Sequence, residues 1–500
     1  MNNIMRILPD RFLGCLGVVS LLGAASPGFA DLADLAGDFQ TELEELAAVT
    51  NQQVYENLLA QGCEDTQREA DSEGCGGQTF VLFTNVRELV HTANEILGSG
   101  PTQFSLGVNL EELGFALRWT AAEEFAAQGS LSSGFVNGQL SGLAGRITAL
   151  RRGARGFVVN FNGAEDVLVA GSAQRLGAGA SADDGAGLND RWSQWGGFLN
   201  GSFLYGEKAP TELENAFDFD GQDINGGIDY RISAHWVAGA VFGYQEQEVD
   251  FDSRRSIVDG GITMEGFSIM PFVLYQSDRW YFSGSAGYQS LEFDTERSIR
   301  YPSLNPDSES VDTLAVSTAD AEVFSMYATA GYSWRLHEQL RLEPYLSLEY
   351  QDITVDKYRE RDIFNDGFDF IVPEQNIDSF ETVLGAKAQF LFSNTWGVLN
   401  PYLDLQWRHQ MEDDARNIRA LYASADGLGD AESFVIPTDV PDSEYYMYTL
   451  GLAAVLRGAA EGGGGGPAAG GIQAFLNWRF IDGLDNYEQD VIALGVRYEF

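Results

Sequence analysis

The chain has 500 residues, and its 74 aspartate and glutamate residues against 30 lysine and arginine residues give a net charge of −44 at pH 7. Phosphate backbones require a positive partner surface, so this charge argues against nucleic acid as a partner. The hydrophobic fraction of 44% is ordinary, and the one long apolar run lies at the N-terminus, which argues against a bundle of membrane-spanning helices.

The first 30 residues have the pattern of a secretory signal peptide. Arg6 and Arg11 supply the positive start, and residues 12–25 supply an apolar core that is too short to span a membrane. Small residues before Ala30 predict cleavage after about that position. We therefore expect an exported protein.

Export affects how the cysteines are interpreted. Cys15 lies in the signal peptide, which leaves Cys63 and Cys75 in the mature chain. An isolated pair in an exported protein predicts one disulfide that closes a small loop. A metal site is not expected, because it would need two more ligands and no histidine lies close in sequence.

Residues 31–118 have helical periodicity. Apolar side chains recur at intervals of three and four residues, and Asn109 followed by Glu112 predicts a capped helix start. The following segment, residues 119–191, begins with a helix rich in glycine and alanine and continues as a Gly/Ala-rich connector. The helix is either a coiled-coil seam or a slender helix that fits inside another structure. Its apolar seam is Val136, Leu140, Leu143, Ile147 and Leu150.

From residue 192 to the end, apolar and polar residues alternate, which predicts strands. In residues 340–351 the leucines occupy one face, while Arg341, Glu343 and Glu349 occupy the other. Twelve strands are predicted, near residues 193–205, 222–233, 236–249, 262–276, 280–293, 321–335, 340–353, 379–392, 397–409, 444–457, 468–481 and 488–500.

The links between these strands alternate in length. Short turns such as 233–235 and 277–279 alternate with long acidic loops at about 206–221, 250–261, 294–320, 354–378 and 410–443. Tryptophans fall near strand ends, as in the aromatic girdles of membrane barrels. The many charged residues on the second face suit a wet lumen better than a dry core. The pattern therefore favours an antiparallel transmembrane barrel over a soluble sandwich.

Several of these stretches resemble the C-terminal translocator domain of monomeric autotransporters, the type V secretion proteins of Gram-negative bacteria. They are WGGFLNGSFLYGEK at 195–208, FDFDGQDINGGIDYRIS at 217–233, WVAGAVFGYQ at 236–245 and the terminal IALGVRYEF. The resemblance covers about residues 192–500. It implies an all-β transmembrane barrel of about twelve antiparallel strands in the outer membrane, with an N-terminal α-helical region and a helix threaded through the lumen.

The resemblance also implies site residues and partners. The last strand would be the signal read by the barrel-assembly machinery, with Val496, Tyr498 and Phe500 as the recognised positions. The barrel would be monomeric and surrounded by outer-membrane lipid and lipopolysaccharide. The basic residues expected to share the lumen with the helix are Arg231, Arg335, Arg341, Lys387 and Arg408.

The chain departs from the family in its N-terminal part. No long repeat that would form a β-helical passenger precedes the barrel, and only about ninety residues of helix do so. The lumen helix holds Asn137 alone, so we expect none of the self-cleavage between adjacent asparagines that some members perform. The five glycines at 462–466 have no assigned role.

No enzyme constellation is present in the sequence, and no cofactor is expected. The four histidines are scattered, and His409 is the one candidate for an outer-membrane lipase. The acidic loop at 410–444 offers a weak calcium hypothesis, but hydrated surface charge is the preferred interpretation.

Three functions follow from these observations. The first is a barrel that anchors and helps to export or display its own short N-terminal region. The second is a helix-plugged pore or structural anchor, with the helical part in the periplasm. The third is an enzyme that modifies lipids.

Overall fold

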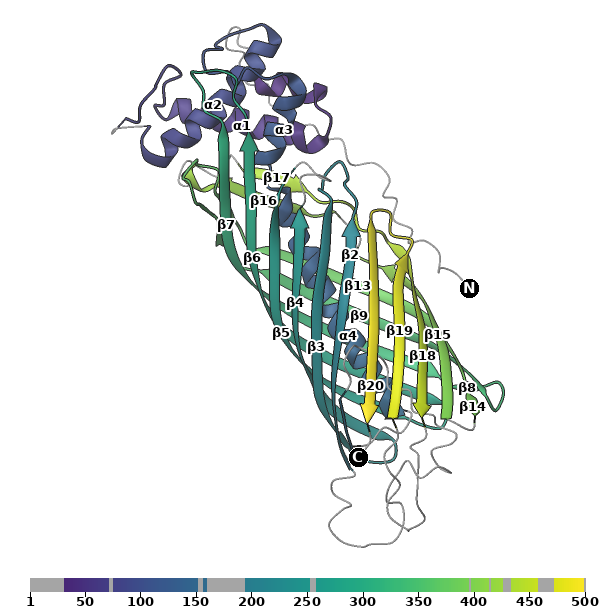
Figure 1. Cartoon of the computed structure of the whole chain (residues 1–500). Helices are drawn as coiled ribbons and strands as arrows, with labels where there is room; N and C mark the ends of the chain where they lie inside the picture. The colour runs from purple at the N-terminus through teal and green to yellow at the C-terminus, as the bar shows by residue number, and fades with distance from the viewer. Residues whose placement is uncertain are drawn as a thin grey trace, which may run out of the picture.

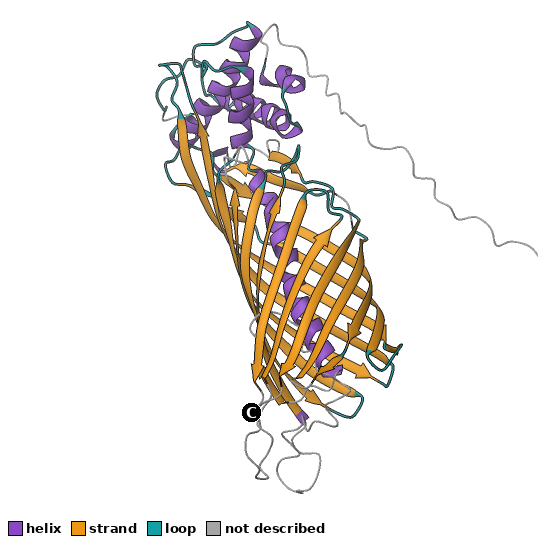
Figure 2. Ribbon diagram, turned by 45° about the vertical axis from the view of Figure 1, so that its right-hand side comes forward, coloured by secondary structure: helices purple, strands orange, loops and turns teal. Residues whose placement is uncertain are grey.

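The structure is a computed structural model that describes residues 31–71, 75–151, 156–159, 194–251, 258–394, 397–412, 415–425, 433–456 and 472–498. A β-barrel carries a group of helices at one end and a further helix inside (Figures 1 and 2). The signal peptide, most of the connector, the 462–466 tract and Phe500 lie outside the described residues.

The helical region, residues 31–120, forms one short 3₁₀-helix and three α-helices. Asn109 and Glu112 form a reciprocal capping box at the start of the third α-helix, as the sequence predicts. The second α-helix ends at Leu97 and is capped by Gly98, whose φ of 69° is in the left-handed region that glycine adopts without strain. The elements are η1 (Leu32–Asp38), α1 (Glu42–Ala60), α2 (Gly77–Leu97) and α3 (Leu110–Thr120).

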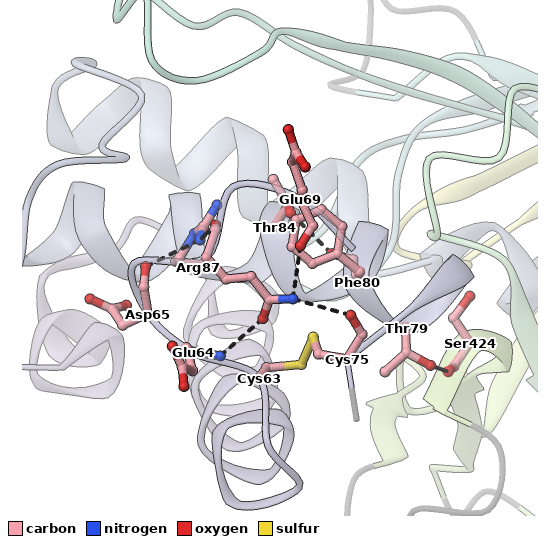
Figure 3. The surroundings of a disulfide bond; sticks show 11 residues. Cys63, Glu64, Asp65, Glu69, Cys75, Thr79, Phe80, Thr84, Arg87 and Ser424 are labelled. Carbon is pink, nitrogen blue, oxygen red and sulfur yellow. Dashed lines mark hydrogen bonds between the residues drawn. A yellow bond between two sulfur atoms is a disulfide. The ribbon is translucent and has the colours of Figure 1, made fainter. Parts of the chain in front are cut away.

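A disulfide closes the loop between α1 and α2 (Figure 3). The Cα atoms of Cys63 and Cys75 lie 4.8 Å apart, and both residues are buried in the core of the helical region. Arg87 of α2 donates to the carbonyl oxygens of Asp65 and Gln67 in the same loop. The loop is therefore fixed from two sides.

The lumen helix is shorter than the sequence suggests. The helical path is interrupted after α3 at Ala122, which has a φ of 57°. A short turn, η2 (Glu123–Ala126), then leads into α4 (Ala127–Arg151). The five predicted seam residues of α4 are all buried.

Twelve antiparallel strands close into a barrel, which confirms the predicted architecture. The last barrel strand, β20, pairs with the first, β2, from Phe203 opposite Ile492 to Lys208 opposite Tyr487, and this pairing closes the ring. The strands are β2 (Trp195–Lys208), β3 (Phe217–Arg231), β4 (Trp236–Phe251), β5 (Gly260–Gln276), β6 (Trp280–Tyr301), β7 (Val311–Tyr332), β9 (Leu340–Val355), β13 (Gln375–Phe390), β15 (Gly397–Gln410), β18 (Glu444–Leu456), β19 (Ile472–Asp482) and β20 (Tyr487–Tyr498). Short added strands are β1 (Gly156–Val159), β8 (Trp334–Arg335), β11 (Arg361–Asp362) and β14 (Phe392–Asn394).

The long loop predicted at 294–320 is mostly strand, because β6 and β7 continue far past their neighbours. Their 22 residues each span roughly 70 Å at about 3.3 Å per residue. A membrane strand needs only about 9–11 residues. The β6–β7 hairpin is therefore much longer than a membrane crossing requires, and Figure 1 shows it extending past the neighbouring strands to the helices.

Along strand β6, the face that carries the apolar side chains changes from the outside of the barrel to the inside. In its lower half Trp280, Phe282 and Tyr288 face outward and are exposed, while Gln289 faces inward. In its upper half the outward residues are Glu292, Asp294 and Glu296, and the inward residues include the buried Leu291 and Phe293. The reversal marks the level at which the strand leaves the lipid and enters water.

Two long loops form a second, four-stranded sheet over the mouth of the barrel, which we call the cap sheet. Alternation did not predict these strands, and within the loop at 410–443 Ile418, Tyr422, Phe434 and Ile436 are buried. The strands are β10 (Tyr358–Arg359), β12 (Phe370–Val372), β16 (Asn417–Tyr422) and β17 (Ser433–Pro437), and the 3₁₀ turn η4 (Ala423–Ala425) follows β16.

Within the described residues, no helix is both long and apolar enough to cross a membrane.

The disulfide generates a prediction. The substitution Cys75→Ser opens a loop with a sequence separation of 12. It should lower the free energy of unfolding of the helical region by about 3 kcal/mol, because the unfolded region regains loop freedom. Protease digestion of residues 31–120 in the detergent-solubilised chain should accelerate, and reductant should have the same effect on the unmodified chain. An unchanged digestion rate would contradict the prediction.

Candidate functional site: the helix-filled lumen

Helix α4 runs down the inside of the barrel and lies against strands β3–β7 and β9 (Figure 2). The helix fits into the lumen because the face that meets β3 and β4 consists largely of glycine. A Cβ atom added at Gly138 would lie 2.9 Å from Oε1 of Gln245, and one added at Gly142 would lie 2.9 Å from Nδ2 of Asn225. Glycine at these positions lets the helix approach the polar wall closely.

Two buried ion pairs hold the lower half of α4. Arg146 donates through Nε and Nη2 to Oδ2 of Asp229 on β3, at 2.9 and 2.6 Å. Arg151 donates to both carboxylate oxygens of Glu343 on β9, at 3.3 and 3.2 Å. The guanidinium carbon of Arg151 also lies 3.3 Å from the ring centroid of Tyr281 on β6. The helix is thus bound to strands on opposite sides of the barrel.

A second network lies on the lumen wall formed by β9, β13, β15 and β18. Arg408 on β15 pairs with Glu349 on β9 and Glu381 on β13, and Tyr445 donates to Glu381 at 2.7 Å. Nearby, Lys387 lies 3.7 Å from Asp404. Each of these charges has an opposite charge within reach, as burial requires.

A cavity of about 830 Å³ remains between α4 and this wall. The small residues of α4, among them Ser133 and Ser141, line one side. Arg408, Lys387 and Asp404 line the other. The lumen is therefore partly filled, and the side chains around the remaining space are mostly polar.

The basic residues expected in the lumen have different positions. Lys387 and Arg408 line the cavity. Arg341 lies 3.9 Å from Glu343 and is partly exposed, and Arg231 is half-buried at the last position of β3. Arg335 is exposed on β8, next to the turn at 336–339, and is not among the residues that line the cavity.

Sequence reasoning missed the partners of these groups. Arg146 belongs to the helix that was expected inside the barrel, and Asp229 has the inward parity of β3. A carboxylate at an inward-facing strand position can therefore be used to predict an ion pair with an arginine of a helix in the lumen. Which carboxylate meets which arginine depends on the depth and rotation of α4, which alternation does not encode.

Other predicted positions lie apart from the lumen network. Val496 and Tyr498 belong to β20 and pair through their backbones with Ala474 and Ile472. His409 is half-exposed, and its ring stacks on Trp407 with centroids 5.6 Å apart. Among the described residues, no group of three His, Cys, Asp or Glu side chains could hold a metal ion.

The junction between the helical region and α4 is enclosed above the lipid. Arg118 donates to both oxygens of Glu123 at 3.0 Å, and Arg297 on β6 donates to both oxygens of Glu360 at 3.1 and 2.7 Å. Glu124 is 1% exposed, and neither of its oxygens has a hydrogen-bond partner among the described residues. Burial raises the pKa of Glu124 from 4.5 to about 8, so its carboxyl stays protonated at neutral pH.

Comparison with known proteins agrees with this geometry. The family model described as "Autotransporter beta-domain" matches residues 197–466, which is more than half of the chain. The chain belongs to the autotransporter β-domain family. None of the curated proteins matches it.

Three solved autotransporter structures are similar to this one. The translocator domain of NalP from Neisseria meningitidis has a TM-score of 0.41 and 14% identity, and the match covers 66% of this chain and 95% of that chain. The β-domain of the Bordetella autotransporter BrkA has a TM-score of 0.38 and 14% identity, with 61% and 100% covered. The transport unit of AIDA-I from Escherichia coli has a TM-score of 0.34 and 12% identity, with 66% and 98% covered.

The buried pair in this autotransporter lumen generates a prediction. Arg146→Ala leaves the Asp229 carboxylate buried without its partner, which should lower stability by about 3–5 kcal/mol. The control Arg300→Ala removes an exposed pair with Asp312 and should change stability by at most about 1 kcal/mol. The temperature at which the folded band is lost on detergent gels measures both effects. Equal shifts for the two variants would contradict the prediction.

Glu124 generates a prediction about pH. The unfolded chain releases this proton near pH 4.5 and the folded chain near pH 8. The stability contributed by the neutral carboxyl is therefore complete below about pH 4.5 and is lost as the pH rises to about 8. Glu124→Gln should be more stable than the unmodified chain near pH 8 and equal to it near pH 5, as judged by thermal unfolding. The exposed control Glu111→Gln should leave the profile unchanged, and a Glu124→Gln profile parallel to the unmodified one would refute the assignment.

Proposed function

We propose that this outer-membrane autotransporter barrel anchors the helical region and displays it at the cell surface, after helping its export. The chain enters the lumen at the end that carries the long loops and leaves it, through α4, at the end that carries the short turns (Figure 1). In outer-membrane barrels the longer loops are extracellular and the short turns periplasmic. The course of α4 is the observation that carries the proposal.

The alternative with the helical part in the periplasm is less well supported. It would require the helical region at the short-turn end, whereas α1 and α2 contact the cap sheet and its adjoining turn at the long-loop end. An enzymatic role has little support, because the nearest charged partner of His409 is Glu444 at 3.9 Å and both side chains are substantially exposed.

The proposal includes the partners expected from the sequence. The signal peptide is removed after about Ala30, and the barrel-assembly machinery reads the last strand at Val496, Tyr498 and Phe500. The assembled barrel is monomeric. Its outward apolar residues contact outer-membrane lipid and lipopolysaccharide.

Accessibility on intact cells tests the display proposal. Glu111 on α3 and Glu338 in the turn between β7 and β9 are both exposed and lie at opposite ends of the molecule. A membrane-impermeant maleimide should label the Glu111→Cys variant on intact cells and should label the Glu338→Cys variant only after lysis. The reverse pattern would support the periplasmic alternative and overturn display.

A further inference from the structure

The barrel loops supply much of the environment in which the helical region is folded. Helix α2 is buried on nearly all sides between Leu82 and Asn94. A surface helix in a small helical unit usually buries one face and exposes the other. The remaining faces of α2 therefore have to be covered by residues from outside the helical region.

The loop after β11 covers one of these faces. Gly367, with a φ of 82°, lies so close that an added Cβ would be 3.0 Å from the backbone nitrogen of Leu82. Asn85 donates a hydrogen bond to the carbonyl oxygen of Asp366. Thr79 donates to the carbonyl oxygen of Ser424, which Figure 3 shows beside the disulfide loop.

The cap sheet covers α1. Tyr422 on β16 is 1% exposed and donates to Oδ1 of Asn51 at 3.0 Å, and Asn51 itself is completely buried. Phe434 on β17 is 1% exposed, whereas its neighbour Val435 faces away and is 39% exposed. One face of the cap sheet is therefore built into the hydrophobic core that also contains the helices.

The β6–β7 hairpin holds the loop between α2 and α3. The backbone nitrogen of Leu304 donates to the carbonyl oxygen of Leu106 at 2.8 Å. Asn305 donates through Nδ2 to the carbonyl oxygen of Ser105 at 2.7 Å, and Ser308 donates to that of Phe104 at 2.8 Å. These bonds pair backbone groups that would otherwise be left without partners inside the protein.

Charge works against folding of the helical region alone. Its basic residues are Arg68, Arg87 and Arg118, and they stand among many aspartates and glutamates. A strongly acidic segment repels itself in a compact state and stays soluble when extended. The apolar contacts and hydrogen bonds from the loops oppose this repulsion.

We propose that the cap sheet and the β6–β7 hairpin act as an intramolecular folding template for the exported segment. The inference rests on the proposed display function. Because the template exists only at the outer end of the assembled barrel, residues 31–120 remain unfolded until they emerge there. Folding on the template then retains the segment at the surface, and the link at residues 121–128 is almost completely buried.

Neighbouring residues on β17 test the proposal in the full-length protein on cells. Phe434→Ala removes a template side chain from the shared core, while Val435→Ala changes the outer face of the same strand. Phe434→Ala should raise the rate of protease cleavage within residues 31–120 at least about tenfold, and Val435→Ala should change it by less than about twofold. The folded barrel band on detergent gels should be unchanged in both.

An unchanged cleavage rate in Phe434→Ala with a folded barrel would overturn the template. If that variant fails to assemble, Tyr422→Phe is compared with Val435→Ala in the same way, because it removes only a hydroxyl that bonds to Asn51 of α1 and keeps the aromatic ring. Labelling of the Glu111→Cys variant is measured in parallel. Labelling together with an unchanged cleavage rate defeats the template alone, whereas absence of labelling on intact cells defeats display itself.

Discussion

The structure depends on one constraint: backbone groups in hydrocarbon have no water with which to form hydrogen bonds. A sheet in lipid must therefore close on itself, and β2 and β20 meet this requirement by pairing with each other. Closure turns the apolar side chains outward and leaves the polar ones around the lumen. The lumen wall is polar and narrow, and α4 meets it with glycine, serine and two paired arginines while its apolar seam is buried.

The same sheet contains two kinds of core. Within the lipid its interior combines the buried apolar seam of α4 with hydrogen-bonded and ion-paired groups such as Arg408 with Glu349 and Glu381. Above the lipid its interior is largely apolar, and Leu291 and Phe293 share it with the helical region and with buried pairs such as Arg297 with Glu360. No linker separates the two kinds of core, because β6 and β7 pass through both. The membrane barrel and the helical region are thus parts of one folded unit.

The barrel could be predicted from sequence because alternation is a local signal. In β9, for example, Leu346 and Leu348 are exposed to lipid while Glu343 and Glu349 are buried, as the pattern predicts. The cap sheet was missed although Ile418, Ala420 and Tyr422 alternate, because six residues in an acidic loop are a weak signal. The break at Ala122 and the pairing of Arg146 with Asp229 depend on tertiary contacts that no local pattern records.

The long β6–β7 hairpin determines how the helical region is held relative to the barrel. A flexible tether would let an exported segment sample many heights and orientations above the bilayer. Strands β6 and β7 are paired along their whole length, and such a continuous hydrogen-bonded hairpin is a stiff support for the helical region. The height of the helical region above the mouth of the barrel is therefore set by the length of β6 and β7.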